Sequence, residues 1–218
     1  MVANATNETA GDAPVEPAPR RDVYLTGFGK FGDILENPTT FITQKLADHP
    51  DVTEAKVLEV SATGSSEELD AFYKKVEVDR GRPSVFLHLG LSAITRVFKL
   101  ESVGYNLADF RIPDERGWVA SNETILEAKQ DSFTTSLPLE EMLETLQKLN
   151  PAAEISTDPG RYICNYVYFK SLSWAEDQAA NGQPKHLALF LHVPYFSVIP
   201  FEDQVAFVKK VIELVAAL

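Results

Sequence analysis

Two short runs of this chain are almost continuously apolar, and they constrain its fold more than any other feature. The first is Ser84–His88 (SVFLH) and the second is His186–His192 (HLALFLH). A strand has this near-continuous apolar pattern when both of its faces are covered, as in the parallel sheets of α/β proteins. We therefore expect a sheet that is buried between two layers of helices.

The segments before the first run alternate between strand and helix patterns. Asp22–Thr26 and Ala55–Val60 are short apolar runs that predict strands. Asn37, followed by a proline, predicts one helix start, and Ser65 with Glu68 fits a capping box that predicts another. Strands separated by helices in this way form parallel sheets with right-handed crossovers, and ligands gather at the carboxyl ends of the strands.

The second half of the chain begins with a β-prone stretch that has no helical period, and helix patterns return after it. We expect β-prone residues over Thr95–Leu107 and short strands or a hairpin at the sheet's edge over Asn122–Ser136. An amphipathic helix is expected over Pro138–Leu149, with Leu139, Met142, Leu143, Leu146 and Leu149 on one face. The remaining elements are a strand over Glu154–Thr157, a helix from near Cys164 to about Asp177, and a closing helix over Phe201–Leu218.

The predicted fold is α/β: a single-domain α/β/α sandwich over residues 21–218, of the phosphorylase/hydrolase-like kind. Its sheet is open, twisted and mostly parallel, with helices on both faces and an antiparallel edge. Residues 1–20 hold almost nothing large and apolar to bury, which predicts a disordered tail.

Charge and cysteine content narrow the class of function. Lysine and arginine number 20 against 32 acidic residues, a net charge of −12, which disfavours nucleic acid and anionic membranes as partners. One cysteine excludes an internal disulfide and a multi-cysteine zinc site, and it suits a reducing compartment. With no run as long as a membrane span and no signal pattern, we expect a cytoplasmic enzyme or binding protein.

The loop after the first predicted strand contains the spacing G-x-G-x-x-G within Gly27–Gly32 (GFGKFG). This spacing is the dinucleotide-binding fingerprint when the glycines open a helix. Here the segment Asp33–Glu36 intervenes with two negative charges, and Phe28 and Phe31 are bulky where close backbone approach is needed. We therefore favour a loop that folds over a small apolar pocket floored by these two phenylalanines.

Cys164 is the only cysteine, and it follows an Asp-Pro-Gly turn signal at the head of a predicted helix. A thiol in the first turn of a helix faces unpaired backbone N–H groups and the positive end of the helix dipole, which favour the thiolate. Cys164 is therefore a candidate nucleophile, although a small buried residue between aromatic side chains would have the same pattern. A nucleophile also needs a base and an acid that orients the base.

The sequence alone leaves several partners open. His49 lies in a loop at a helix end, and His186 opens its strand at the wrong end of a parallel sheet. His88 and His192 both end an apolar strand, where sites form, and either could instead be a core residue bonded to a backbone carbonyl. The plausible acids are Glu101, Asp109, Asp114 and Asp158, any of which could be a solvated or capping carboxylate.

Four spaced motifs narrow this choice. They are Thr26–Gly32 followed by Asn37-Pro38, Gly104–Asp114, Gly160–Asn165 and Leu191–Pro194. Together, in this order, they resemble the pyroglutamyl peptidase type I family, which comprises cytosolic cysteine peptidases that remove an N-terminal pyroglutamate. The resemblance spans about Asp22 to Leu218.

The resemblance implies specific roles. The nucleophile of the family falls on Cys164, its histidine on His192 and its acid on Glu101. The positions that line its pyroglutamate pocket fall on Phe28, Phe31, Ile112, Tyr162 and Ile163, and Arg111 matches an arginine near the reacting carbonyl. The implied substrates are small peptides with an N-terminal pyroglutamate, and the implied chemistry needs no metal and no cofactor. The chain departs from the usual family pattern at Lys30, Phe110 and Arg161.

Two other functions are alternatives to the peptidase activity that the resemblance implies. One is a nucleotide- or dinucleotide-binding enzyme that uses Gly27, Gly29 and Gly32. The other is a non-catalytic binding module on the same fold. The sequence does not distinguish a monomer from a homo-oligomer.

Overall fold

The chain folds around a six-stranded sheet in the computed structural model, which describes residues 20–78 and 82–218. Its strands, in spatial order, are β2 (Val52–Leu58), β1 (Asp22–Phe28), β3 (Ser84–Leu91), β8 (Leu187–Val193), β4 (Phe98–Glu101) and β7 (Ala153–Ser156). The first four are parallel, β4 is antiparallel to β8, and β7 is parallel to β4. The mostly parallel sheet with an antiparallel edge is confirmed. The tail expected over residues 1–20 lies outside the described residues, apart from Arg20.

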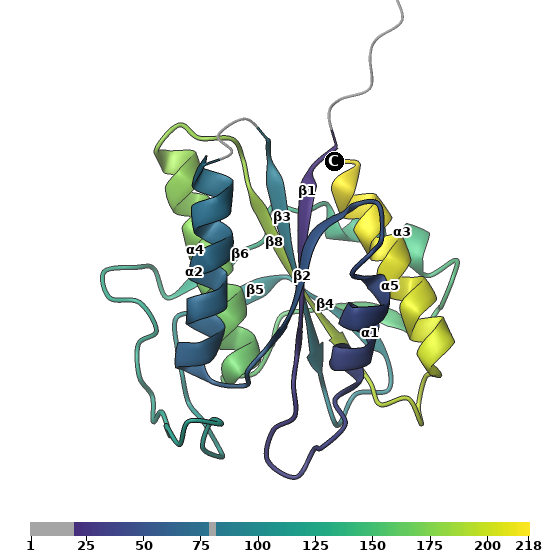
Figure 1. The fold of residues 1–218 in the computed structure, drawn as a ribbon, viewed down its shortest axis with the longest axis horizontal. Helices are drawn as coiled ribbons and strands as arrows, with labels where there is room; N and C mark the ends of the chain where they lie inside the picture. The colour runs from purple at the N-terminus through teal and green to yellow at the C-terminus, as the bar shows by residue number, and fades with distance from the viewer. Residues whose placement is uncertain (1–19, 79–81) are drawn as a thin grey trace, which may run out of the picture.

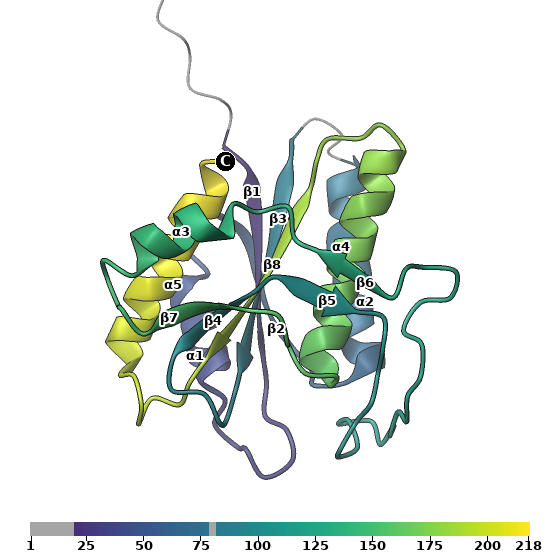
Figure 2. The ribbon, with the colours of Figure 1, turned by 180° about the vertical axis from the view of Figure 1, so that it is seen from behind.

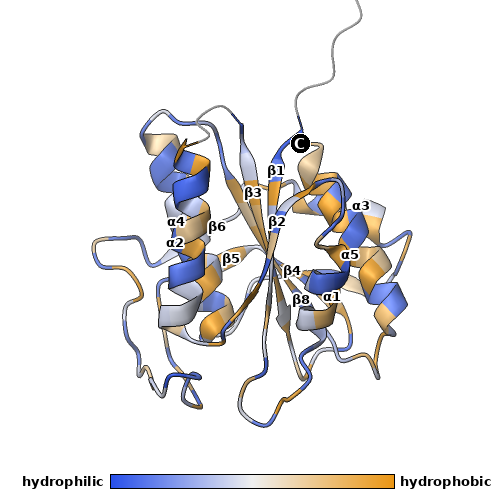
Figure 3. Cartoon of the chain, viewed as in Figure 1, coloured by the Kyte–Doolittle hydropathy of each residue, from blue (hydrophilic) through white to orange (hydrophobic). Residues whose placement is uncertain are grey.

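Five helices are found in the described ranges, in two layers (Figures 1 and 2). On one face lie α2 (Ala62–Val78) and α4 (Ile163–Ala180), and on the other lie α1 (Pro38–Leu46), α3 (Leu139–Leu146) and α5 (Phe201–Ala216). Each helix carries both hydrophobic and hydrophilic residues (Figure 3), as helices with one face on a core do. Among the helices of these two ranges, none has the length together with the apolar character that a membrane span requires.

A hydrophobic core fills each space between sheet and helices. Ile42 of α1 and Val208 of α5 are fully buried in one core, and Phe72 of α2 and Tyr168 of α4 in the other. Burying one such side chain contributes roughly 1.5–3 kcal/mol. The sheet is therefore covered on both faces, as the apolar runs predict, and the carboxyl ends of its parallel strands are left for a site.

The start of α2 differs from the prediction. The helix begins at Ala62, and its first turn is capped by Ser61 Oγ, which accepts from Gly64 N–H (3.0 Å), and by Asp114 Oδ2, which accepts from Ala62 N–H (3.0 Å). The capping box predicted at Ser65 is wrong, because Ser65 already lies inside the helix. A carboxylate 52 residues away along the chain supplies the second cap.

A second, two-stranded antiparallel sheet is formed by β5 (Val103–Tyr105) and β6 (Ser132–Thr134). It lies against α4 (Figure 2), so the prediction that Asn122–Ser136 joins the edge of the main sheet is wrong. The edge beyond β4 is taken by β7. The prediction that Leu149 lies on the apolar face of the helix is also wrong, because α3 ends at Leu146 and Leu149 is 58% exposed.

Candidate active site

Cys164 is the second residue of α4, at the helix start that its sequence predicts. Tyr162 is the N-cap residue and makes no side-chain capping bond, so the backbone N–H groups of the first turn are left for another acceptor. Cys164 is half-buried. The thiol therefore lies at the positive end of an 18-residue helix.

Gly90 lies directly beneath this thiol. A Cβ added to Gly90 would lie 3.1 Å from Cys164 Sγ and 2.6 Å from the ring of Phe190. Gly90 faces His192 in the register of β3 and β8. Cys164 Sγ therefore lies against β3 at the position where His192 is the neighbouring residue on β8, near the carboxyl ends of these two central strands.

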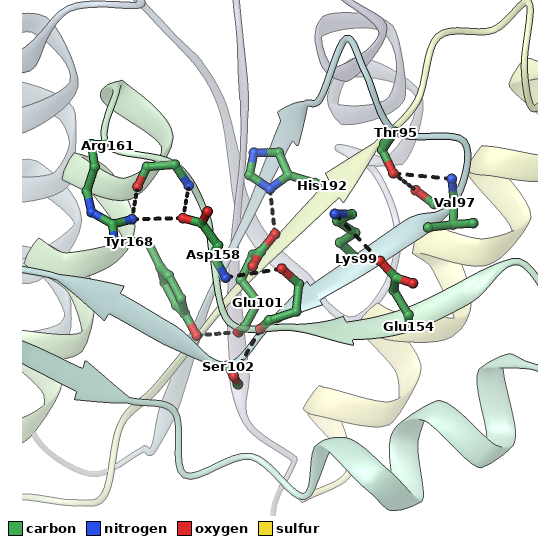
Figure 4. Close-up of polar contacts among 12 residues, drawn as sticks. Thr95, Val97, Lys99, Glu101, Ser102, Glu154, Asp158, Arg161, Tyr168 and His192 are labelled. Atoms are coloured by element: carbon green, nitrogen blue, oxygen red, sulfur yellow. Dashed lines mark hydrogen bonds and ion pairs between the residues drawn. The ribbon is translucent and has the colours of Figure 1, made fainter. Parts of the chain in front are cut away.

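A carboxylate completes the contact on the far side of His192. His192 Nδ1 and Glu101 Oε1 are 2.8 Å apart (Figure 4), and both side chains are buried. Glu101 ends β4 and faces Phe190 in the antiparallel register with β8. Because residues two apart on a strand share a face, Glu101 reaches His192 diagonally across the strands.

These contacts set the charge of the imidazole. Burial lowers the pKa of His192, but hydrogen bonds to Cys164 and Glu101 outweigh burial and raise this pKa to about 9. His192 is therefore protonated at neutral pH, and a protonated imidazole stabilises a neighbouring thiolate. With Nδ1 on Glu101, Nε2 is the nitrogen left for the thiol.

His88 is placed differently from the sequence expectation that it ends a strand. The strand β3 continues to Leu91, and His88 is fully buried in its middle. Its Nδ1 lies 2.7 Å from Thr26 Oγ1 and its Nε2 lies 2.9 Å from Ser171 Oγ. Burial lowers the pKa of His88 to about 3, so this ring is a neutral core residue that has no contact with the thiol.

The other acids left open by the sequence have partners elsewhere. Asp114 caps α2, Asp158 pairs with Arg161 (2.9 Å), and Asp109 accepts a long bond of 3.4 Å from Asn122 N–H. Within the described residues, Glu101 alone of the four hydrogen-bonds a histidine.

The residues that the resemblance assigns to a pocket surround the head of α4. Phe28 ends β1 with 2% of its surface exposed, and Ile163 is fully buried in the same core cluster. The rings of Phe31 and Tyr162 are 6.3 Å apart. Ile112 is 44% exposed, and its Cδ1 lies 3.6 Å from a Cβ built on the glycine that follows Phe31.

Arg111 lies next to Ile112 on the long connection between β5 and β6, and its side chain is exposed. It makes no hydrogen bond or ion pair to any residue that the structure describes. Its guanidinium is therefore available to a bound molecule.

The three departures from the family pattern do not fill this region. Phe110 is buried and makes edge contacts with Tyr162 and Trp118, each at 4.9 Å, so it supports the pocket wall. The Arg161 guanidinium lies 3.9 Å over the Tyr105 ring. Lys30 points into solvent.

The glycine loop does not present its amides as a phosphate-binding loop would. Gly29 N–H donates to Leu58 O (2.9 Å), and Gly32 N–H donates to Glu115 Oε1 (2.9 Å). A backbone N–H that would donate to pyrophosphate in a dinucleotide-binding loop is thus already hydrogen-bonded to a carboxylate. Gly27 serves packing, because a Cβ there would lie 2.5 Å from the Thr39 carbonyl of α1.

Gly90 and Phe190 are site residues that the sequence reasoning missed. The only signal was a glycine inside an apolar run, which indicates a close approach by another group. No three His, Cys, Asp or Glu side chains within residues 20–78 and 82–218 gather as metal ligands would.

Replacing Gly90 with alanine is expected to displace the thiol. The added methyl group cannot occupy its site without moving Phe190 or Cys164 Sγ, which costs about 1–3 kcal/mol of stability. We expect a lower melting temperature and alkylation of Cys164 by iodoacetamide that is roughly tenfold slower at pH 7, because the sulfur moves away from His192. Wild-type alkylation kinetics in the variant would show that the close approach has no effect on the thiol.

Comparisons with known proteins place most of this chain in one family. The family model described as pyroglutamyl peptidase matches residues 21–210. The pyrrolidone-carboxylate peptidase of Thermococcus litoralis is 32% identical over 179 residues, which are 80% of this chain and 77% of the relative, and that of Pyrococcus furiosus is 31% identical over 177 residues, 79% and 80% of the two chains. The crystal structure of a pyrrolidone carboxyl peptidase from Fervidobacterium islandicum AW-1 superposes with a TM-score of 0.78 at 30% identity, covering 89% of this chain and 97% of the other.

Proposed function

Because this chain belongs to the pyroglutamyl peptidase family, we propose that it is a thiol hydrolase that removes the N-terminal pyroglutamyl residue from small peptides. The observation that carries the proposal is the buried His192, whose Nδ1 lies 2.8 Å from Glu101 Oε1 and whose pKa is raised by both Cys164 and Glu101. A thiol, a base and an orienting acid in this order are the parts of a cysteine nucleophile. They lie beside a cluster of aromatic side chains at the carboxyl ends of the strands.

In the first step, the Cys164 thiolate attacks the pyroglutamyl carbonyl carbon and forms a C–S bond. The negative charge moves to the carbonyl oxygen, where the Cys164 backbone N–H at the helix start can donate to it. The exposed Arg111 guanidinium is a second donor of suitable charge. His192 then gives its proton to the departing amine as the C–N bond breaks, which leaves a thioester on Cys164.

In the second step, water attacks the thioester, and His192 accepts the proton of that water. The C–S bond breaks, pyroglutamate leaves, and the thiolate is restored. Glu101 holds Nδ1 throughout, so that Nε2 faces the sulfur and the leaving group.

Specificity follows from the lining of the pocket. An N-terminal lactam is flat, compact and uncharged, and it suits the apolar surroundings of the cluster that contains Phe28, with Phe31 and Tyr162 packed against it. An ordinary amino terminus is a cation and would lose its water without a counter-ion in such a slot. The pocket therefore selects against the positive charge as well as for the shape of the ring.

The proposal is tested by release of a fluorescent amine from a pyroglutamyl amide in the presence of EDTA. The matched control is the corresponding prolyl amide, whose five-membered ring lacks the lactam carbonyl and carries a protonated nitrogen. We expect hydrolysis of the first substrate and kcat/KM lower by roughly 10³-fold or more for the second. Absence of hydrolysis by folded, reduced protein would contradict the proposal and favour the non-catalytic binding module.

We further propose a cytoplasmic location and a role without nucleic acid or membrane partners. The nucleophile is the only cysteine and must stay reduced, which suits a reducing compartment, and the net charge of −12 disfavours polyanions.

A further inference from the structure

One buried side-chain amide joins the helix of the nucleophile to the segment that follows Glu101. Asn165, the next residue after Cys164, is fully buried. Its Oδ1 accepts from Tyr105 N–H (2.8 Å), and its Nδ2 donates to Tyr105 O (2.8 Å) and to Leu107 O (3.0 Å). Both amide protons and the amide oxygen are thus used, and all three partners are backbone groups of the same segment.

That segment runs from Glu101 to Ile112, and it carries the proposed catalytic acid at one end and Arg111 near the other. Beyond β5 it forms no strand, and the backbone of Asn106, Ala108 and Phe110 hydrogen-bonds to the other arm of the same connection. The segment is held at two further points, one on α4 and one just before that helix. Tyr168 OH donates to Glu101 O (2.7 Å; Figure 4), and Asp109 N–H donates to the carbonyl of Arg161 just before the helix (3.0 Å).

We propose that Asn165 is a positioning residue that sets the pocket wall at the correct distance from the thiol. Cys164 and Asn165 are consecutive in α4, so the helix fixes their backbones relative to one another. The amide binds the segment four residues before Arg111 and five before Ile112, and it therefore fixes where these two side chains lie relative to the sulfur. This inference rests on the proposed function, and Asn165 itself touches no reacting atom.

A purely structural role would give a different result, and the chain offers a matched control. Asn106 makes the same kind of clamp in the neighbouring position: its Nδ2 donates to Leu126 O and its Oδ1 accepts from Leu126 N–H, both at 2.8 Å. Its side chain is also buried. These bonds join the two arms of the connection between β5 and β6, and they do not involve α4.

The experiment compares Asn165→Ala with Asn106→Ala. Both variants lose a buried amide and should melt at lower temperature than the wild type. For Asn165→Ala we expect KM for a pyroglutamyl amide to rise roughly tenfold or more, with a smaller fall in kcat, because the wall moves relative to the thiol. For Asn106→Ala we expect KM to change by less than about threefold.

A second readout separates the pocket from the nucleophile. The rate at which iodoacetamide alkylates Cys164, measured across pH, should match the wild type in Asn165→Ala, because the contacts among Cys164, His192 and Glu101 are kept. A parallel fall in alkylation rate would overturn the proposal by showing that Asn165 acts on the thiol. Equal KM values for the two alanine variants would overturn it by showing a general effect of a lost amide.

If Asn165→Ala does not fold, Asn165→Gln keeps the amide on a side chain longer by one methylene. We expect a folded protein with raised KM and unchanged alkylation, and wild-type KM would refute the positioning role. The two proposals fail separately: an inactive wild type refutes the function, whereas an active wild type with unaltered KM in the Asn165 variants refutes only this inference.

Discussion

Replacing Cys164 with alanine is expected to lower kcat/KM for a pyroglutamyl amide by roughly 10⁵-fold or more. The thiolate forms the bond to the substrate carbonyl, and no other thiol exists in the chain to replace it. The half-buried side chain packs over a glycine, so its truncation should leave the fold intact. Amine release is measured beside the wild type with EDTA present, and the melting temperature reports folding.

Cys164→Ser is the matched control for size and polarity. Its hydroxyl is far less acidic than a thiol, so His192 cannot keep it ionised, and we expect activity close to that of the alanine variant. Hydrolysis by Cys164→Ala within about tenfold of the wild-type rate would exclude a covalent role for the cysteine. Binding of a pyroglutamyl peptide by the inactive variant would show that the pocket survives.

Replacing Glu101 with glutamine is expected to lower kcat by roughly 10³–10⁴-fold, although the two side chains have nearly the same shape. We attribute the lower kcat to the removal of the negative charge beside His192. Oε1 contacts His192 Nδ1, and Oε2 is buried with no hydrogen-bond partner in the part of the chain that the structure describes. The glutamine oxygen can still accept from Nδ1, but it cannot stabilise the imidazolium as a carboxylate does.

The pH dependence of this variant gives an independent readout. The pKa of His192 is raised to about 9 in part by Glu101, so wild-type kcat/KM should fall above about pH 9, where the imidazolium loses its proton. In Glu101→Gln the pKa of His192 should be lower, and the alkaline limb should move to lower pH. Asp158→Asn is the control, since it removes an exposed acid near the same helix start that pairs with Arg161 instead. An unshifted limb in Glu101→Gln would contradict the assigned contact.

Local patterns in the sequence predict most of the fold, because most of its elements are encoded locally. Apolar runs locate β1, β3 and β8, and the Asn-Pro pair locates the start of α1, where Asn37 Oδ1 indeed accepts from Thr39 N–H. The start of α2 could not be found in this way, since Asp114 supplies its cap from a distant loop. The same limit applies to β6, whose partner depends on the packing of α4.

The candidate site shows the same division between local and long-range signals. The helix start at Cys164 is a local feature and is confirmed. The choice between His88 and His192 depends on where a buried strand ends, and an apolar run does not mark that point; the family resemblance favours His192. The clamp made by Asn165 binds backbone groups, so the identity of its partners leaves no trace in the sequence.

The buried His88 has a consequence for the acid stability of the protein. Its ring is held neutral between Thr26 and Ser171, whereas the same histidine in the unfolded chain takes up a proton with a pKa near 6.5. Protons therefore bind preferentially to the unfolded chain as the solution is acidified. The contribution of His88 to stability is complete above about pH 6.5 and is lost progressively as the pH falls towards 3. Proton linkage at a residue outside the catalytic contact thus makes this fold less stable as the solution becomes acidic.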